Sequence, residues 1–322
     1  MRSYIFRRLI QTIIMVFLLS MFSFYLMALM PGDPVDIMAT SNPNLTTDDI
    51  RRLKALYGLD KPIIVRYWNW LNTVLSGDLG YSRTYRVPVG DILGHRLVNT
   101  FFLSFSALLL ALIIAIPIGI LSALKKGSAF DYGVNLLSFA GISVPSFFLG
   151  IILIIVFSLW LNWLPAGGTE TVGEHLVGLE LFTDRFKFIL LPMLSLTAMQ
   201  MAIFVRYTRS SMIETMRNDY IRTARAKGLG RNRVVFIHAL RNALIPVVTI
   251  IALSFSHIFS GAIITETLFA YQGAGKLVYD SIIANDYNVA MVSFVITVGM
   301  VLVMNLIADI LYCYLDPRIS YQ

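Results

Sequence analysis

Few residues of this sequence have the types and spacing that catalysis requires. The string AYQGAGKL at 270–277 is similar to a nucleotide-binding loop, yet it lacks the first glycine and the hydroxyl residue after the lysine that would hold magnesium. His257 and Ser260 share one helix face, as a hydrolase pair would, but no glycine framework around the serine provides an oxyanion site. The sequence therefore predicts no catalytic residue, and an intramembrane hydrolase is the least favoured alternative.

Metal and cofactor sites have no better support. The four histidines, at positions 95, 175, 238 and 257, form no pair at metal-ligand spacing on one helix face. The single cysteine, Cys313, excludes a disulfide framework and a cysteine-based zinc or iron–sulfur site. We therefore expect no metal and no cofactor on this chain. An activity that needs ATP would require a separate ATPase chain.

The composition is that of a membrane protein. Hydrophobic residues make up 57% of the 322 residues, charged residues make up only 14%, and the mean hydropathy is +0.72. Ordinary globular chains hold roughly 45–50% apolar and about 25% charged residues. So few charges cannot cover the surface of a water-soluble fold, which excludes a soluble enzyme and a nucleic-acid-binding domain.

Six long stretches of the sequence lack charged residues altogether, and each is at least 18 residues long. Eighteen residues of helix reach roughly 27 Å, which is close to the thickness of a bilayer core. The sequence therefore predicts an all-α polytopic membrane protein with six transmembrane helices. We expect these helices at 9–30, about 99–124, about 134–161, about 187–206, about 243–265 and about 287–309.

Basic residues set the expected orientation. If both termini are cytoplasmic, the inner segments hold 15 of the 26 lysines and arginines, although they are shorter in total than the outer segments. The positive-inside rule assigns the side richer in basic residues to the cytoplasm. We therefore place 1–8 and 314–322 inside and interpret the net charge of +7 as a topology signal, with no nucleic-acid partner. The first apolar run is too long for the core of a signal peptide, so we expect a retained anchor.

Four of the expected helices contain a proline, namely Pro117, Pro145, Pro192 and Pro246. Proline removes a backbone donor and kinks a helix, and lipid cannot satisfy the freed carbonyl. Kinked inner helices suit a bundle with a pathway through it, although packing irregularity in an ordinary bundle would explain them too.

The segment 31–96 is too long to be a plain connector between spans. Thr46 and Asp49 have the spacing of a capping box, and Pro62 can begin a second helix. We therefore expect a small helical extracytoplasmic subdomain. The alternative is an interfacial aromatic belt without a further role, formed by Tyr67, Trp68 and Trp70.

The cytoplasmic loop 207–241 is the most informative part of the sequence. Asn218 or Asp219 can cap a short helix that continues to Lys227, where Gly228 interrupts it. A second helix is expected from about Asn232 into the fifth span. Such a pair could dock in a groove on another protein or rest on anionic membrane lipid, and the physical arguments favour neither. The polar face of the second helix holds Arg231, His238, Arg241 and Asn242, and the apolar face holds Val234, Ile237, Leu240 and Leu244.

Two strings of this loop, DYIRTARAKGL at 219–229 and HALRNA at 238–243, resemble the cytoplasmic coupling loop of binding-protein-dependent ABC importer permeases. The resemblance extends along the whole chain and is narrower still, to the oligopeptide, dipeptide and nickel branch. The long segment after the first span is similar to the B-type subunit of that branch, which pairs with a shorter-looped C-type subunit. Supporting strings lie at 31–34, 58–62, 77–80, 208–212, 265–266 and 316–318.

The resemblance implies one permease subunit of an ATP-driven importer in a bacterial cytoplasmic (inner) membrane, with the type I permease fold and a core at 97–313. It also implies a non-identical C-type permease subunit, two cytoplasmic ATPase subunits that hold ATP and magnesium, and an external substrate-binding protein. Di- or oligopeptides are the expected substrate, with oligosaccharides or nickel and other metal chelates as alternatives. His238, Arg241 and Asn242 are expected to support the coupling helix. That helix is expected to comprise Asp219, Tyr220, Ile221, Arg222, Thr223, Ala224, Arg225, Ala226, Lys227, Gly228 and Leu229.

A stripe of uncharged polar residues on the fifth span, together with Gln200 on the fourth, is our prediction for the substrate path. The alternative is that these hydroxyls bond to carbonyls of their own helix or of a neighbour. A rival function is an ion-coupled carrier or channel, but such proteins keep ionisable groups at mid-membrane, whereas Glu266 and Asp309 mark the ends of expected spans. The stripe comprises Asn242, Thr249, Ser256 and Ser260, and the pathway-lining candidates are Gln200, Thr249, Ser256 and Ser260.

Overall fold

The computed structural model describes residues 2–29, 34–41, 45–56, 58–255, 257–260 and 262–315, with all side chains among them except those of 2–4, 34, 37–38, 41, 260 and 312–315. Over these residues the chain is helical, and its only β-type contact is an isolated bridge between Tyr81 and Pro88. The expected all-α fold class is confirmed.

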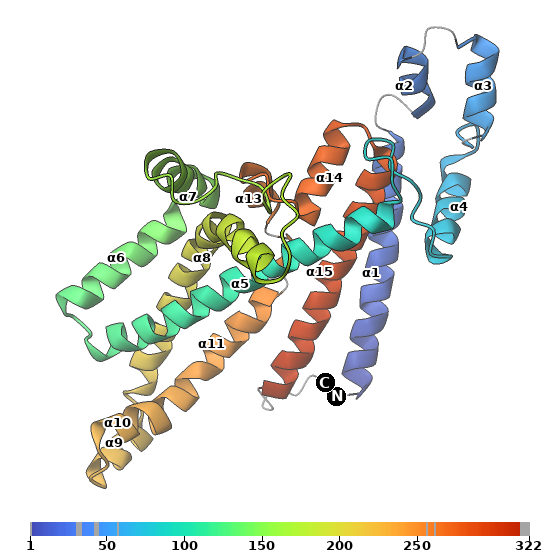
Figure 1. The fold of residues 1–322 in the computed structure, drawn as a ribbon. Helices are drawn as coiled ribbons and strands as arrows, with labels where there is room; N and C mark the ends of the chain where they lie inside the picture. Colours follow the sequence, from blue (N-terminus) through green and yellow to red (C-terminus); the bar gives the residue numbers. More distant parts are fainter. Residues whose placement is uncertain are drawn as a thin grey trace.

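The first long helix and three short ones form one side of the molecule (Figure 1). Helix α4 packs against α1 through Tyr67, whose ring lies edge-on to Phe24 with 5.6 Å between centroids. The Tyr67 hydroxyl lies 2.9 Å from Ser20 Oγ, so its polar end is satisfied inside the contact. The helices are α1 (Arg2–Ala28), α2 (Pro34–Ser41), α3 (Thr47–Leu56) and α4 (Ile63–Leu75).

Helix α3 begins with the capping box that the sequence predicts. The Thr46 N–H donates to Asp49 Oδ2 at 3.0 Å, and the Asp49 N–H donates to Thr46 Oγ1 at 3.3 Å. The Thr46 hydroxyl also donates to Asp49 Oδ2, at 2.6 Å, and this bond, together with that from the Thr46 N–H, lowers the pKa of the Asp49 carboxyl below its ordinary value. No described residue of α3 is buried, and the helix stands away from the long helices (Figure 1). Tyr57, expected at its end, lies outside the described residues, as do 31–33 and 316–318 of the supporting strings.

Among the described residues, five helices are long and apolar enough to cross a membrane, and a bent pair makes a sixth if it counts as one span. Pro117 and Pro192 lie inside two of them without ending the helix. Both helices extend beyond the uncharged stretches from which they were expected, because charged residues at a span end do not interrupt backbone hydrogen bonding. The five are Ile5–Ala28 within α1, α5 (Val89–Leu124), α8 (Gly178–Thr215), Arg231–Phe255, and Tyr287–Leu311 within α15 (Tyr287–Leu315).

The bent pair lies where one helix, kinked at Pro145, was expected at about 134–161. Helix α6 (Ala129–Ser143) meets α7 (Ser146–Leu153) and its π-helical continuation η1 (Ile154–Trp160) at an angle of 102°. The break falls at Pro145, which cannot donate a backbone hydrogen bond, and at Val144, which is extended with ψ 121° as a residue before proline prefers.

Helix α11 covers the first part of the fifth expected span, 243–265. Ser256 and Gly261 lie outside the described residues, and the described residue Ala262 is not helical. Three short helices are described between Phe255 and α15. Pro246 lies inside α11 without breaking it. The elements in order are α10 (Arg231–Arg233), the π-helical η2 (Val234–Ala239), α11 (Leu240–Phe255), α12 (His257–Ser260), α13 (Ile263–Leu268) and α14 (Ala274–Ile283).

Helices α5 and α8 form the tightest pair of the bundle. A Cβ added at Gly119 would lie 2.7 Å from Thr208 Cβ and 3.0 Å from the Val205 carbonyl, so glycine allows the two backbones to approach. Helix α11 packs against both α8 and α15, and α15 packs against α1. The result is a layer of inclined helices beside the α1–α15 pair (Figure 1).

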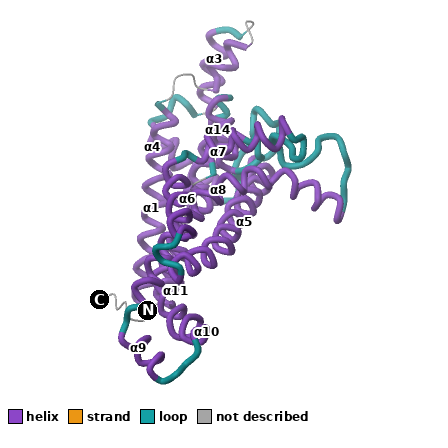
Figure 2. The backbone as a smooth tube through the Cα atoms, turned by 90° about the vertical axis from the view of Figure 1, so that its left-hand side faces the viewer, coloured by secondary structure: helices purple, strands orange, loops and turns teal. Residues whose placement is uncertain are grey.

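The first turns of α1 and the last turns of α15 lie at the same end of the molecule (Figure 1). Arg8 on α1 and Asp309 on α15 form an ion pair at 3.3 Å. A short helix, α9 (Asp219–Ala226), lies at this end with α10, and α3 lies at the opposite end (Figure 2). The described ends of the chain, at Arg2 and Leu315, therefore share a side with the 207–241 loop.

Candidate functional site

Helix α9 projects at the end of the bundle, between α8 and α10 (Figures 1 and 2). It begins after Asn218, as the sequence predicts, and ends at Ala226, one residue before the predicted end at Lys227, which is its C-cap. The Leu229 N–H donates to the Ala224 carbonyl and the Gly228 N–H to the Arg225 carbonyl, at 3.3 and 2.9 Å. These two bonds form a Schellman motif, which needs the left-handed φ of +77° found at Gly228.

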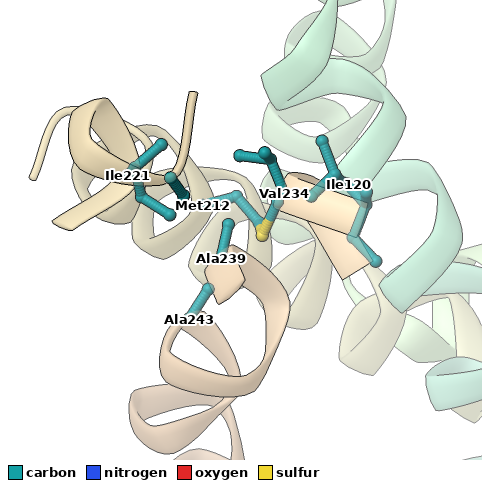
Figure 3. Close-up of a cluster of buried hydrophobic side chains, with 8 residues drawn as sticks. Ile120, Met212, Ile221, Val234, Ala239 and Ala243 are labelled. Carbon is teal, nitrogen blue, oxygen red and sulfur yellow. The ribbon is translucent and has the colours of Figure 1, made fainter. Parts of the chain in front are cut away.

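The inner face of α9 is anchored in an apolar cluster. Ile221 is fully buried and Ala224 nearly so, and both belong to a cluster with side chains from the ends of α5 and α8 and the start of the second loop helix (Figure 3). Burying an isoleucine side chain contributes roughly 1.5–3 kcal/mol, which is enough to hold a helix this short in place. The cluster comprises Ile120, Met212, Ile221, Ala224, Val234, Val235, Ala239 and Ala243.

The outer face of α9 has no such cover within the described chain. Tyr220 is 42% exposed. Arg222 pairs with Asp219 at 3.0 Å, but both are exposed, so the pair contributes little to stability. Helix α9 is therefore fixed on one side and open on the other. The exposed residues are Asp219, Tyr220, Arg222, Thr223, Arg225, Ala226, Lys227 and Gly228, and Leu229 is half-buried.

The second loop helix runs without a break from Arg231 to Phe255, but its faces differ from the sequence prediction. Val234 is buried as expected, whereas Ile237, predicted on the apolar face, is 56% exposed. The neighbouring Val235 is buried in its place. The cause is the π-helical stretch η2, because a wider turn rotates the following residues away from the positions of a regular 3.6-residue period.

A cavity of about 430 Å³ opens between α9, the end of α5 and η2. Its floor is apolar, with Leu124, Met216 and Val234 among the lining residues. Arg225 and Arg231 line it as well, and both are exposed. The cavity therefore lies beside the anchored face of α9, with two guanidinium groups at its edge.

The three residues expected to support the loop lie along η2 and α11. Asn242 Nδ2 donates to the His238 carbonyl at 3.1 Å, which is a bond within one helix. Arg241 and Asn242 are exposed, and His238 is half-buried. None of the three belongs to the cluster that anchors α9. Their supporting role stays a prediction.

The pathway candidates are only partly within the described part of the chain. Ser256 lies outside it, and so does the side chain of Ser260. Thr249 Oγ1 donates to the Ile245 carbonyl of its own helix at 3.3 Å, which is the alternative to lining a path. Gln200 lies on α8, which packs against α11, and its Oε1 is buried without a hydrogen-bond partner among the described residues. The pathway itself stays a prediction.

The glycine string at 270–277 holds one of the chain's own carboxylates. Glu266 is 0% exposed, and it accepts from Thr100 Oγ1 at 2.5 Å and from the Lys276 N–H at 2.9 Å. A Cβ at Gly273 would lie 2.2 Å from Glu266 Cδ, and one at Gly275 would lie 3.0 Å from Oε2. The likeness to a phosphate-binding loop thus has a physical basis, since the N-terminus of α14 binds an anion.

A second buried carboxylate, Asp131, lies near α9 and pairs with Arg209. The sequence prediction missed both sites, because each joins residues far apart in the chain. The available signals were two acidic residues beside otherwise apolar stretches and an arginine inside the 208–212 string. Within the part of the chain that the structure describes, no three His, Cys, Asp or Glu residues lie together as a metal site would require.

Two family profiles together cover most of the chain. Residues 115–321 match the family described as binding-protein-dependent transport system inner membrane component. Residues 1–104 match the N-terminal domain of the same kind of membrane component. The match to the first profile includes α9, the cluster beneath it and both buried carboxylates.

Several curated proteins are similar over their full length. The oligopeptide transport system permease protein AppB of Bacillus subtilis (strain 168) is 42% identical over 322 residues, which cover 100% of both chains. The di/tripeptide transport system permease protein DppB of Pseudomonas aeruginosa (strain UCBPP-PA14) is 39% identical, with 100% of both chains covered. The dipeptide transport system permease protein DppB of Escherichia coli (strain K12) is 36% identical at the same coverage.

One solved structure supports the fold. A chain in the structure of the MetNI methionine ABC transporter aligns with a TM-score of 0.54, covering 70% of this chain and 96% of that one. The two chains are 16% identical, so this similarity shows the fold alone. The expected importer permease fold is confirmed.

Proposed function

Because the chain belongs to the family of binding-protein-dependent transport system inner membrane components, we propose that it is a membrane-spanning subunit of an ATP-driven peptide importer. It is a multi-pass protein of the cytoplasmic membrane. The similar permeases named above carry oligopeptides, dipeptides or tripeptides, which supports short peptides as the substrate.

The observation that carries this proposal is the division of α9 into two faces. Ile221 and Ala224 attach the helix to the bundle, while Tyr220, Thr223 and Lys227 remain open. A helix of eight residues is marginal in water on its own, so its shape depends on the anchored face. An open face held in a fixed shape suits docking into a groove of another protein.

We assign the groove to a cytoplasmic ATPase subunit. Two such subunits would bind ATP and magnesium, and each would hold one permease subunit by its α9. This chain would pair with a second, non-identical permease subunit, and an external binding protein would deliver the peptide. The chain itself would do no covalent chemistry.

The connections of α9 indicate how movement would reach the membrane. Helix α8 enters α9 after the cap at Met216, and the Schellman turn at Gly228 leads into the helix Arg231–Phe255. ATP-driven closure of the ATPases would displace α9 and so tilt α8 and α11 together. Packed helices switch between discrete arrangements, so this tilt would open the pathway on one side and close it on the other.

The outer segment 31–96 has a proposed role in delivery. Helix α3 presents acidic and basic side chains around an exposed surface, and no described residue of it is buried. We assign to this segment the contact with the binding protein or the second permease subunit.

Uptake by the purified complete importer in vesicles tests the proposal. We expect uptake of a radiolabelled dipeptide to require ATP and the binding protein. Replacing Thr223 on the open face with tryptophan is expected to lower uptake about tenfold, because interface contacts of this kind contribute on the order of 1–2 kcal/mol. Thr183→Trp, at an exposed site on α8, is the matched control and is expected to change nothing.

Two results would contradict the proposal. One is uptake driven by an ion gradient without ATP, which would favour a carrier. The other is a Thr223→Trp importer that transports as well as the Thr183→Trp control.

A further inference from the structure

Asp131 is a buried carboxylate with an unusually complete set of donors. It is 2% exposed. Arg209 donates to both of its oxygens, from Nε at 2.6 Å and from Nη2 at 2.8 Å. Ser122 Oγ donates at 2.5 Å, the Gly127 N–H at 3.0 Å and Asn135 Nδ2 at 3.1 Å. Five donors therefore converge on one side chain.

These donors come from separate parts of the fold. Ser122 belongs to the last turn of α5, Gly127 to the turn that follows, and Asn135 to α6, in whose first turn Asp131 lies. Arg209 belongs to α8, two turns before that helix ends. The carboxylate thus joins α5, α6 and α8 at the end of the bundle that bears α9.

The ion pair between Arg209 on α8 and Asp131 on α6 is the contact that can transmit movement from α8 to α6. Helix α8 continues through Met216 into α9, so a displacement of α9 acts first on the segment that contains Arg209. Helix α6 has no direct path to α9 along the chain, because α7 and a long loop intervene. Helices α6 and α8 also pack directly, with a Cβ added at Gly141 lying 3.1 Å from Ala202 Cβ, and the bidentate pair adds a directional contact that fixes their register at this end.

The neighbouring contact between α5 and α8 supports the same conclusion. The backbones already touch where Gly119 meets Thr208, the residue before Arg209. Helices α5 and α8 therefore cannot slide past each other at this level. The Arg209–Asp131 pair joins α6 to the α5–α8 pair.

We propose that Arg209 is a positioning residue for transport, which passes the movement of α9 to α6 through Asp131. This inference rests on the proposed function. In the wild-type importer α5, α6 and α8 move as one body when the ATPases close. Without the bidentate pair, α8 follows α9 and α6 lags behind.

Distances between spin labels in the complete, purified importer test the inference. In a Cys313→Ser background, one label pair joins position 218, just before α9, to position 13 on α1. The other pair joins position 137 on α6 to position 13, and Leu137 and Ile13 are both exposed. Each distance is measured without nucleotide and with ATP trapped, and uptake per ATP hydrolysed is measured on the unlabelled variants.

The test variant is Arg209→Lys, and the matched control is Arg206→Lys, one turn earlier on α8 and exposed. Lysine keeps the charge but cannot form the two parallel bonds. In Arg209→Lys we expect the 218–13 change to remain, the 137–13 change to fall to about half or less, and uptake per ATP to fall about tenfold. Arg206→Lys is expected to match the wild type in all three measurements.

The outcomes separate this inference from the function on which it rests. A wild-type 218–13 distance that ignores nucleotide contradicts the proposed function, and the inference falls with it. A full 137–13 change with unaltered uptake per ATP in Arg209→Lys overturns the inference alone. If Arg209→Lys does not assemble, Asp131→Asn, which breaks the same ion pair from its other side, decides: a reduced 137–13 change supports the inference and a full change overturns it.

Discussion

The two ends of the bundle each bury a carboxylate against α5, and they hold it by different means. Asp131, at the α9 end, is held mainly by the side chain of Arg209 from another helix. Glu266, at the other end, is held by Thr100 and by the backbone of its own glycine turn. Neither is more than 2% exposed.

This difference indicates different tasks. A carboxylate bound by backbone N–H groups of a nearby turn closes that turn and fixes α14 against α5. The close approach at Gly273 and Gly275 leaves that site no freedom. A carboxylate bound by a long side chain from α8 adds a polar link among three helices that also pack against one another. We therefore interpret the Glu266 end, where α14 is fixed against α5, as a rigid part of the fold, called the fixed frame below. We interpret the Asp131 end as a connection between α5, α6 and α8, which move together.

The largest expected effect is on the fixed frame. Glu266→Ala leaves Thr100 Oγ1 and the Lys276 N–H without their buried acceptor, and unsatisfied buried donors cost about 1–3 kcal/mol each. We expect a loss of about 3 kcal/mol in the free energy of unfolding, seen as a lower thermal midpoint of the detergent-solubilised importer. Glu180→Ala, at an exposed site of α8, is the control. Equal thermal midpoints for Glu266→Ala and Glu180→Ala would show that Glu266 does not stabilise this part of the fold.

A smaller loss of stability is expected at the other carboxylate. Asp131→Asn breaks the ion pair, but Arg209 keeps 22% of its side chain exposed and can turn toward water. We expect about 2 kcal/mol of destabilisation, below the range for fully buried pairs. Asp91→Asn, exposed in the first turn of α5, is the control. A midpoint lower than that of Glu266→Ala would reverse the order of the two sites.

The turn after α9 provides a third and milder comparison. Gly228 has φ +77° and no atom within 4 Å of an added Cβ, so only the backbone conformation resists substitution. Gly228→Ala is expected to cost about 1 kcal/mol, whereas Gly230→Ala, at φ −59° and in equally open space, is expected to cost nothing measurable. Thermal unfolding compares the two.

A large side chain at position 228 tests the coupling of ATP hydrolysis to uptake rather than the stability of the fold. Gly228→Trp is expected to match Gly228→Ala in stability and to uncouple ATP hydrolysis from uptake, because the indole would project beside α9 where the ATPase docks. Normal uptake per ATP in Gly228→Trp would place the docking surface elsewhere.

The smallest effect is expected far from both ends, at the exposed start of α3. The hydrogen bonds from Thr46 lower the pKa of Asp49 below 3.8, so the cap is fully formed above that pH and is lost as pH falls through the lowered pKa. Thr46→Ala removes the hydroxyl but keeps the backbone N–H donor, so it is expected to weaken α3 at neutral pH and to reduce this dependence. Amide hydrogen exchange in α3 between pH 5 and pH 3 measures it. An unchanged pH profile in Thr46→Ala would show that the cap does not govern α3.

The local features of α9 follow from the sequence. It starts after Asn218, as expected, although the Asn218 side chain makes no capping hydrogen bond, and the turn that ends it at Gly228 depends on bonds within a few residues that are observed. The capping box at Thr46 is local in the same sense.

Features that depend on tertiary packing could not be predicted from the sequence. Arg209 lies 78 residues from Asp131, and Thr100 lies 166 residues from Glu266, so no periodicity connects them. Pro145 predicts a break, but not the 102° angle that packing of α7 imposes. The π-helical stretch η2 shifts which side chains are buried, and a regular helical period cannot reveal that shift.

The central claim is that an ATPase subunit binds the open face of α9, and site-specific crosslinking tests it most directly. In a Cys313→Ser background, cysteine is placed at 223 on the open face or at 224 on the anchored face of the same helix, and a short thiol crosslinker is added to the complete importer. We predict that position 223 joins this chain to an ATPase subunit and that position 224 does not. An importer in which Thr223→Cys forms no such product and stays fully reactive toward a water-soluble thiol reagent would contradict the account.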